Sequence, residues 1–448
     1  MIEQPVATAV HVSGKVFDDH HPPAADLLSV CVHCGFCLQT CPTYTLWGKE
    51  MDSPRGRIHL ISMAIDGEVE LTDPYVSHFD HCLGCMACVT ACPSGIKYGR
   101  LIEAMRGQVE RLHHRSLWER IQRRMIAATF SRPARLRKLA VALRVYQRLG
   151  LQRLFHALHL TSLLPASLRT MEQLMPDLSR SETSAVLPPR IAAEGQKRRT
   201  VAMMTGCVQS VFAAQVNAAT AHVLSAEGCE VLTPPDQGCC GALLLDLGQE
   251  EEGLNLARKL IDLLEPLQAD AIIVNAAGCG AVLKEYGYLL RDDPAYRERA
   301  LAFSAKCKDP SEVLAELPAR APRHSIDLRV GFHDPCHLQH AQGLREPPRA
   351  ALRTIPGVQL VELPEAALCC GSAGVYNLLQ PEAGHQLGQR KVDNIVSTSA
   401  QVVATGNPGC QLQISALLNE KGKPMPVMHY MELLDASITG KKLPGAAR

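Results

Sequence analysis

Two runs of four cysteines, each ending directly before a proline, are the residues of this chain best suited to hold metal. Both runs read C-x₂-C-x₂-C-x₃-C-P, the bacterial spacing for [4Fe–4S] clusters. In two-cluster ferredoxins, three cysteines of a run bind one cluster and the fourth binds the other. The rule predicts one cluster on Cys31, Cys34, Cys37 and Cys92, and another on Cys82, Cys85, Cys88 and Cys41. Zinc is the alternative, but zinc sites usually pair two C-x₂₋₄-C units and lack further cysteines at this register.

Eight more cysteines recur at a fixed spacing in the second half of the chain. The gaps are 32 and 39 residues in the first set and 33 and 40 in the second. A constant offset of this kind indicates a duplicated domain. Cys229 and Cys307 fall outside both sets and are predicted to be small buried apolar residues. The first set is Cys207, Cys239 and Cys240 before Gly241, and Cys279; the second is Cys336, Cys369 and Cys370 before Gly371, and Cys410.

Each of these cysteine sites follows a short apolar run that reads as a β-strand. The strands alternate with helical patterns, an order typical of βαβ units and a mostly parallel sheet. Such sheets bind ligands at the carboxyl ends of their strands, so we expect the cysteines to converge on one cleft. A vicinal disulfide, a redox thiol pair and simple packing are the alternatives to metal or cofactor ligation. The predicted strands are 200–204, 229–232, 271–274, 328–332, 358–361 and 401–404; the predicted helices are 217–226, 251–264 and 411–418.

The composition is that of an ordinary globular protein. The 448 residues are 46% hydrophobic and 20% charged, with a net charge of +1, which suggests several domains. The near-neutral charge and few aromatic residues do not support nucleic-acid binding. The cysteine spacing is unlike a secreted disulfide framework. With no signal peptide and no run of eighteen apolar residues, we expect a cytoplasmic protein.

The predicted fold class is therefore α+β and multi-domain. A mainly helical two-cluster ferredoxin-like domain covers residues 1–105, and a helical basic connector covers 106–198. Two duplicated α/β domains, each with a Cys-Cys-Gly sequence, cover 199–320 and 321–448. Composition marks linkers at 181–199 and near 317–323.

The connector combines many arginines with leucines at helical spacing between residues 106 and 158. Either it is an ordinary amphipathic helix with a solvated basic face, or it docks on anionic lipid or a partner subunit. Two readings also apply to Ser53-Pro54-Arg55-Gly56-Arg57. The segment is either a solvated turn before a helix, or a positive edge that stabilises a reduced cluster or contacts a partner.

Histidines stand beside several of the cysteines. His33 and His81 could hydrogen-bond to cluster sulfur, although a surface histidine is the simpler reading. His333 and His337 flank Cys336 in the expected cleft and are candidate ligands. A nucleotide site is not indicated, because Leu283 interrupts the G-x-G-x-x-G pattern that begins at Gly278, and no Walker A sequence is present.

Taken in order, these motifs resemble the iron–sulfur subunit family of glycolate oxidase. The resemblance covers roughly residues 25–440 and is weakest over 106–195. It implies an electron-transfer subunit that is not catalytic alone. Flavin-containing subunits would oxidise glycolate or another 2-hydroxy acid, and this chain would pass the electrons to a quinone-type acceptor, with peripheral contact at the inner face of the membrane. The sequences that support it include VCVHCGFC from Val30, CPTY from Cys41, SPRGRI from Ser53, GCG from Gly278 and LQHAQ from Leu338.

The resemblance extends to a wider superfamily whose members remain alternatives. One is the electron-transfer subunit of a glycerol-3-phosphate dehydrogenase, and another is a heterodisulfide reductase-like enzyme. The heterodisulfide reductase domain ends in C-x-x-C and builds a non-cubane cluster. Here Val282 and Gln413 occupy the position of the extra cysteine. Each repeat therefore has four of these cysteines and lacks the fifth. We still expect further iron–sulfur clusters at the Cys-Cys-Gly sites, but the missing cysteine weakens that expectation. A redox-sensing scaffold is the non-catalytic alternative.

Overall fold

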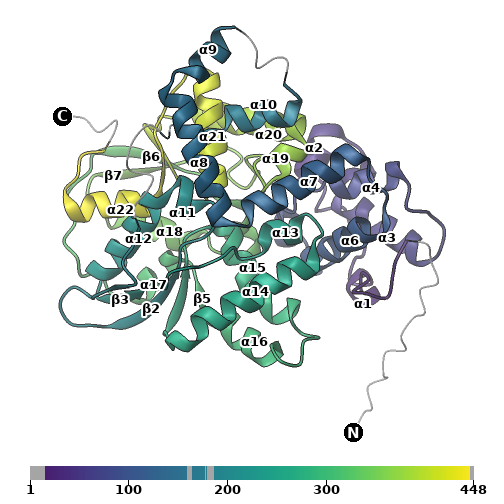
Figure 1. Ribbon diagram of the computed structural model, residues 1–448, viewed down its shortest axis with the longest axis horizontal. Helices are drawn as coiled ribbons and strands as arrows, with labels where there is room; N and C mark the ends of the chain where they lie inside the picture. The colour runs from purple at the N-terminus through teal and green to yellow at the C-terminus, as the bar shows by residue number, and fades with distance from the viewer. Residues whose placement is uncertain (1–15, 159–163, 177, 179–185, 444–448) are drawn as a thin grey trace.

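The computed structural model describes residues 16–158, 164–176, 178 and 186–443. It has an α+β multi-domain architecture, as the sequence predicted. A helical N-terminal domain packs beside two α/β units, and a helical connector runs between them (Figure 1). Among the described residues, no helix is long and apolar enough to cross a membrane.

The N-terminal domain consists of short helices around a core that includes Ile61, Phe79 and Leu101. Proline starts α2 and α3, where its fixed φ suits the first helical position. The Ser53 hydroxyl caps α3 by accepting from the Gly56 N–H at 3.0 Å. The helices are α1 Ala25–Leu28, α2 Pro42–Trp47, η1 Glu50–Asp52, α3 Pro54–Ile65, α4 Asp73–Asp80, α5 Ala87–Thr90 and α6 Tyr98–Leu112.

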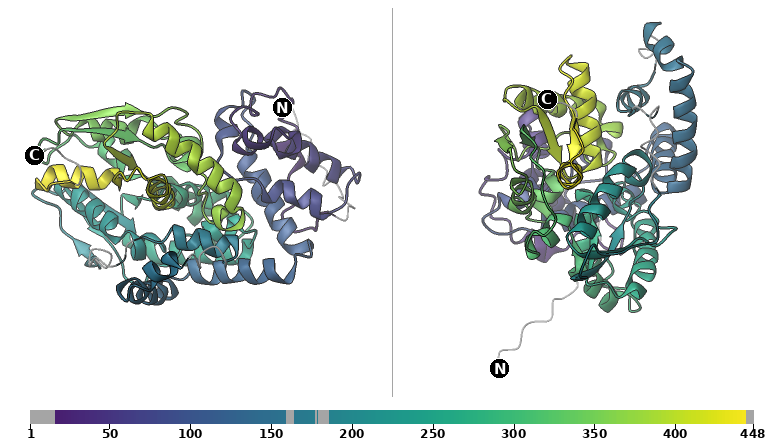
Figure 2. Two further views of the ribbon diagram at one scale, coloured as in Figure 1. Left: turned by 90° about the horizontal axis from the view of Figure 1, so that it is seen from above. Right: turned by 90° about the vertical axis from the view of Figure 1, so that its left-hand side faces the viewer.

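The connector contains four helices, and α7 to α9 confirm the helical segment that its leucine spacing predicted up to residue 158. A capping box between Ser116 and Glu119 starts α7, and Pro133 starts α8. In Figure 2 (right) α8 and α9 project from the body of the molecule. The bounds are α7 Leu117–Phe130, α8 Pro133–Arg148, α9 Leu151–Ala157 and α10 Ala166–Gln173.

The first α/β unit is built on a five-stranded sheet in the order β1-β3-β2-β4-β5. All its pairs are parallel except β1 with β3. Alternate residues of β2 and β4 pack against α12 and α17 on one face and against α14, α15 and α16 on the other. The strands are β1 Arg190–Ile191, β2 Arg199–Met204, β3 Cys229–Leu232, β4 Ala271–Val274 and β5 Cys307–Lys308. The helices are α11 Gln209–Phe212, α12 Ala214–Ala226, α13 Ala242–Asp246, α14 Glu250–Leu264, η4 Glu265–Leu267, α15 Ala277–Leu289, α16 Arg297–Lys306 and α17 Pro310–Glu316.

The second unit has a four-stranded, wholly parallel sheet in the order β7-β6-β8-β9. Helices α18 and α22 cover one face, and α20 and α21 cover the other. The strands are β6 Leu328–Phe332, β7 Val358–Glu362, β8 Val402–Thr405 and β9 Val427–His429. The helices are η5 His337–Ala341, α18 Glu346–Arg353, α19 Tyr376–Leu379, α20 Pro381–Val396, α21 Pro408–Glu420 and α22 Tyr430–Thr439.

All six predicted repeat strands and all three predicted helices are present within a few residues of their expected bounds. One part of the expected 181–199 linker differs. Residues 179–185 lie outside the described residues, but Arg190–Ile191 adds β1 to the first sheet. The reason is a long-range pair, because the Arg190 guanidinium binds the Glu230 carboxylate on β3.

Gly241 and Gly371, which follow the two cysteine pairs, form turns that the packing around them requires. Gly241 and Gly371 have φ of +86° and +85°, a region that disfavours other residues. A Cβ would lie 2.6 Å from the Gly253 carbonyl oxygen at Gly241 and 2.2 Å from that of Gly384 at Gly371. The cysteine turn of the first repeat thus rests directly on α14, and that of the second repeat rests on α20.

The two α/β units join through α12 and α22, which pack against each other between the sheets. Buried polar contacts fix this interface. The Tyr430 hydroxyl donates to Asp309 Oδ1 at 2.5 Å, and His429 Nε2 lies 3.0 Å from the Asn275 carbonyl oxygen. These contacts turn the carboxyl ends of both central strands toward one region of the molecule.

Candidate iron–sulfur centres and a cysteine-lined cavity

The first predicted cluster set, Cys31, Cys34, Cys37 and Cys92, lines one small cavity of about 30 Å³. Cys34 is exposed, so this set lies at the molecular surface. Gly35 takes φ of +85° between two of the cysteines, and Arg55 Nη1 donates to the His33 carbonyl at 3.0 Å. The four thiols therefore face one space although Cys92 is far from the others in sequence.

The second predicted cluster set, Cys41, Cys82, Cys85 and Cys88, is buried. Burial raises the pKa of the Cys85 and Cys88 thiols well above its usual range, and the neighbouring cysteines raise it further. Four close thiolates would be costly at this depth without a cation. Iron supplies that charge, so the donor set and its burial fit a cluster.

Cys88 also lines the cavity of the first set. The two cluster sets are therefore neighbours. Such adjacency suits transfer of single electrons between two cubanes.

Arg57 is a buried cation beside the second set. Its side chain is 1% exposed. Although burial opposes it, the sulfur atoms of Cys82 and Cys41 and the Tyr98 hydroxyl raise the pKa of Arg57. The guanidinium donates to the His78 carbonyl at 2.5 Å and to Thr43 Oγ1 at 3.2 Å. For Arg57 the solvated-turn reading was wrong, because α3 points this residue inward.

Asp52 balances the charge of Arg57. Its Oδ1 lies 3.6 Å from Arg57 Nη2 and 3.0 Å from Nδ1 of both His78 and His81. Burial opposes ionisation, but the histidine hydrogen bonds lower the pKa of Asp52. His81 is therefore oriented by this carboxylate, and its ring packs at a tilt of 56° against Trp47, with ring centroids 4.6 Å apart.

A cavity of about 250 Å³ separates the two α/β units, and it is lined by Cys207, Cys239, Cys240, Cys279, Cys336, Cys369 and Cys410. Apolar side chains of the connector, including Phe130, Leu143 and Met171, form another part of its wall. The N-terminal domain contributes Met86 and Glu103. Burial, with Asp246 and Glu285 nearby, raises the pKa of Glu103 to about 8. Thiols from both repeats thus meet at one space.

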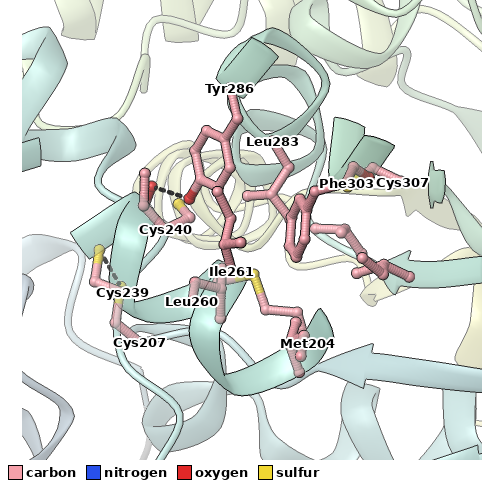
Figure 3. Packing of buried hydrophobic residues seen from close by; sticks show 14 of the residues in the cluster. Met204, Cys207, Cys239, Cys240, Leu260, Ile261, Leu283, Tyr286, Phe303 and Cys307 are labelled. Carbon is pink, nitrogen blue, oxygen red and sulfur yellow. Dashed lines mark hydrogen bonds between the residues drawn. The ribbon is translucent and has the colours of Figure 1, made fainter. Parts of the chain in front are cut away.

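In the first repeat, the Sγ atoms of Cys207 and Cys239 lie 3.5 Å apart (Figure 3). The Tyr286 hydroxyl donates to the Cys240 carbonyl at 2.6 Å and holds the cysteine turn against α15. Met204 and Leu260 are among the apolar side chains packed around these thiols. The first site is therefore surrounded mainly by apolar groups.

In the second repeat, polar groups surround the thiols. His337 Nδ1 lies 3.7 Å from Cys336 Sγ. Lys391 is fully buried in α20 and donates to the Glu365 carbonyl at 2.7 Å. Burial lowers the pKa of His333 well below its usual range, and the Lys391 charge adds to the effect, so its ring is neutral.

The second cluster set lies next to the second repeat. Cys85 packs in one buried cluster with Cys336 and Cys369. The Tyr376 hydroxyl donates to the His81 carbonyl at 3.1 Å, and Thr90 Oγ1 lies 2.8 Å from His340 Nδ1. Sequence spacing could not predict the first of these contacts, because it joins residues 295 positions apart.

All eighteen cysteines are free. Cys229 and Cys307 are buried in the sheets, as predicted. Lys391 and Glu103 were missed as site residues, because nothing local in the sequence marks a buried lysine or a carboxyl group that faces a cavity. Arg57 was named only within the segment 53–57, for which a positive edge near a cluster was one of two interpretations.

Comparison with known proteins agrees with this arrangement. A model described as a 4Fe-4S dicluster domain matches residues 27–96, and a cysteine-rich domain matches residues 201–284 and 330–415. Residues 118–175 match the linker region of the glycolate oxidase iron–sulfur subunit. The glycolate oxidase iron–sulfur subunit of Escherichia coli is 37% identical over 419 residues, or 93% of this chain and 95% of the relative.

The chain belongs to the family of glycolate oxidase iron–sulfur subunits.

Two further relatives show how far the family pattern extends. A probable glycolate oxidase iron–sulfur subunit of Bacillus subtilis is 38% identical over 414 residues, covering 90% of this chain and 92% of the relative. Lactate utilization protein A of an Exiguobacterium species is 28% identical over 239 residues, which cover 53% of this chain and 98% of the relative. As a member of this family, the chain is an electron-transfer subunit of an oxidoreductase. Its 4Fe-4S dicluster domain and cysteine-rich domains are of kinds that support iron–sulfur clusters.

We predict that Arg57→Gln lowers the reduction potential of the buried cluster by roughly 50–150 mV. Loss of a unit charge from a buried site removes a few kcal/mol of stabilisation from the reduced cluster. Arg57→Lys should keep the potential within a few tens of millivolts of the wild-type value. Redox titration followed by EPR measures both. Equal potentials in the glutamine and lysine variants, with iron content unchanged, would contradict the role of the charge.

Proposed function

We propose that this subunit carries electrons from flavin-containing subunits of a glycolate, or other 2-hydroxy acid, dehydrogenase to a quinone-type acceptor. The observation that supports this proposal is the order in which the sites adjoin one another in space. The surface cluster set adjoins the buried set, the buried set adjoins the second repeat, and both repeats face one cavity. Bound cubanes supply one-electron carriers between a two-electron flavin and the acceptor.

In this proposal Cys31, Cys34, Cys37 and Cys92 ligate one cubane, and Cys41, Cys82, Cys85 and Cys88 ligate the other. The cysteines of the two repeats hold further metal or cluster groups. Convergence of each set and the cost of burying unpaired thiolates support this assignment. The protein then acts in the cytoplasm, without catalysing substrate oxidation itself.

A test of the division of labour is Cys85→Ser in the assembled complex. The variant should lose about four of its irons and most electron flow to an artificial quinone. Reduction of the flavin by glycolate should survive, because substrate chemistry takes place on the other subunits. Cys229→Ser, at a buried cysteine outside every proposed site, is the matched control. Loss of flavin reduction in an intact Cys85→Ser complex would show that the roles are not separate.

The surface cluster set is the proposed docking edge for the flavin subunits. Val32 and Phe36 stand 68% and 67% exposed on the loop that also carries the exposed Cys34. Large apolar side chains at this exposure favour a protein partner. A partner seated here would bring its flavin close to the cluster nearest the surface.

We predict that Phe36→Asp weakens binding of the flavin subunits at least about tenfold, the cost typical of an aromatic anchor. Val186→Asp, at another strongly exposed valine on the segment before β1, should leave binding unchanged. Pull-down with purified flavin subunits measures the affinity. Equal affinity in both variants would remove this loop from the interface.

The connector provides a proposed membrane-contacting surface. On α7, α8 and α9 large apolar side chains remain in solvent, and Trp118 is 56% exposed. Between residues 117 and 158 the chain has one acidic residue, Glu119. The exposed apolar residues are Leu117, Trp118, Ile121, Met125, Val141, Val145, Leu149, Leu151 and Leu154. The exposed basic residues are Arg120, Arg124, Arg132, Arg135, Arg137, Lys138 and Arg148.

An anionic lipid surface suits this combination better than a protein groove. Exposed aromatic and leucine side chains insert at the headgroup boundary, and each nearby Lys or Arg adds about 1 kcal/mol on an anionic bilayer. Because α7 and α8 also line the cavity, with Phe130 and Leu143, contact there brings the cysteine-lined cavity near a membrane-dissolved quinone.

We predict that the full-length protein sediments with phosphatidylglycerol vesicles and much less with phosphatidylcholine vesicles. Trp118→Glu combined with Arg124→Glu should reduce binding at least about tenfold through lost insertion and charge. Val186→Glu is the control and should bind as the wild type does. Equal binding to both lipids, or no effect of the double variant, would refute lipid contact by the connector.

A further inference from the structure

The two repeats share a backbone frame but differ at two positions next to their cysteines. Three residues before the first cysteine stand Met204 in one repeat and His333 in the other. The second position is counted from the glycine that contacts the cysteine turn, Gly253 in the first repeat and Gly384 in the second. Seven residues later, the first repeat has Leu260 and the second has Lys391. The first site thus has a thioether and a leucine where the second has an imidazole and an ammonium group.

His333 directly follows β6 at the inner end of the second sheet. Its backbone N–H donates to the Ala404 carbonyl at 2.8 Å and fixes it against β8. The side chain is 1% exposed. Neither ring nitrogen has a hydrogen-bond partner within the described ranges. A buried imidazole with two unsatisfied nitrogens is costly, which indicates a missing partner.

Sulfur atoms occupy the space where that partner would lie. A ring nitrogen of His333 and the Sγ atoms of Cys370 and Cys410 all lie within 4.8 Å of one another. A tetrahedral ion with bonds of about 2.0–2.3 Å holds its ligand atoms about 3.3–3.8 Å apart. Small side-chain rotations therefore suffice to bring all three atoms onto one metal. Neutral imidazole and thiolate are both strong ligands for iron and zinc.

We propose that His333 is a metal ligand of the second repeat and forms, with Cys370 and Cys410, a mixed nitrogen–sulfur site that the first repeat lacks. The metal is an iron of a cluster or a single tetrahedral ion such as zinc. The inference rests on the proposed function in one respect, namely that the second repeat holds metal.

The position of this site means that a histidine ligand would affect electron transfer from the neighbouring cluster. It adjoins the buried cluster set through the contact of Cys85 with Cys336 and Cys369. Replacement of thiolate by imidazole raises the potential of an iron–sulfur centre, and the buried Lys391 charge acts in the same direction. If the metal is iron, the second repeat attracts electrons from the neighbouring cubane more strongly than an all-thiolate site does.

The experiment uses the full-length protein, purified anaerobically, and three variants. His333→Met introduces the residue that the first repeat has at this position, and His333→Cys offers a replacement ligand. Cys229→Ser, at a buried cysteine outside every proposed site, is the control. Iron and zinc per chain are measured, with the two cubanes as an internal standard. Release of the remaining metal to EDTA is then followed over time.

Nitrogen ligation is read by pulsed EPR on protein labelled with ¹⁵N-histidine, after exchange for cobalt(II) if the metal is zinc. The wild type should hold metal beyond about eight irons and show a histidine nitrogen coupling. His333→Met should lose the coupling and release the metal at least about tenfold faster. His333→Cys should retain the metal without the coupling, and Cys229→Ser should leave both unchanged.

Two results would overturn the inference, and they differ in what else they affect. If the wild type holds the extra metal but shows no histidine coupling, and His333→Met releases it at the wild-type rate, His333 is not a ligand and the metal-bearing repeat stands. If the wild type holds only the iron of two cubanes, both the ligand and the metal-bearing repeat are refuted.

Discussion

Arg57 and Lys391 each place a positive charge in the protein interior beside cysteine sulfur. Arg57 faces Cys41 and Cys82, and Lys391 faces Cys369 and Cys370. Close thiolates repel one another and lose their hydration when buried, so the chain must supply compensating charge. Backbone carbonyls at His78 and Glu365 hold these cations in place. The packing of α3 and α20 therefore follows from the need to keep sulfur ligands buried and close together.

Duplication gives the protein two similar frames that need not do the same work. In both repeats a glycine of positive φ seats the cysteine turn against a later helix, α14 in the first repeat and α20 in the second. The side chains around that turn then differ: Tyr286 holds the first turn, whereas histidine and lysine surround the second. A conserved backbone with changed neighbours is sufficient to make two sites chemically distinct, because ligand type and nearby charge set metal affinity and potential.

The connector has two roles that its sequence combines in single helices. Its inward side chains close the cavity between the repeats, and its outward side chains leave an apolar and basic surface in solvent. A helix can do both because residues three or four apart share a face, while intervening residues lie on the opposite one. The cavity and the exposed surface are thereby separated by the thickness of one helical layer.

The sequence by itself determined what depends on near neighbours along the chain. Cysteine spacing predicted the two cluster motifs and the duplication, and apolar runs predicted β3 and β4 to the residue, because ligand loops and strand patterns are local properties. Only the tertiary structure decided that Cys85 meets Cys336, that Arg57 is buried, that β1 completes the first sheet and that His333 faces Cys370 and Cys410. Those outcomes depend on contacts between residues tens to hundreds of positions apart, which the packing of domains alone brings together.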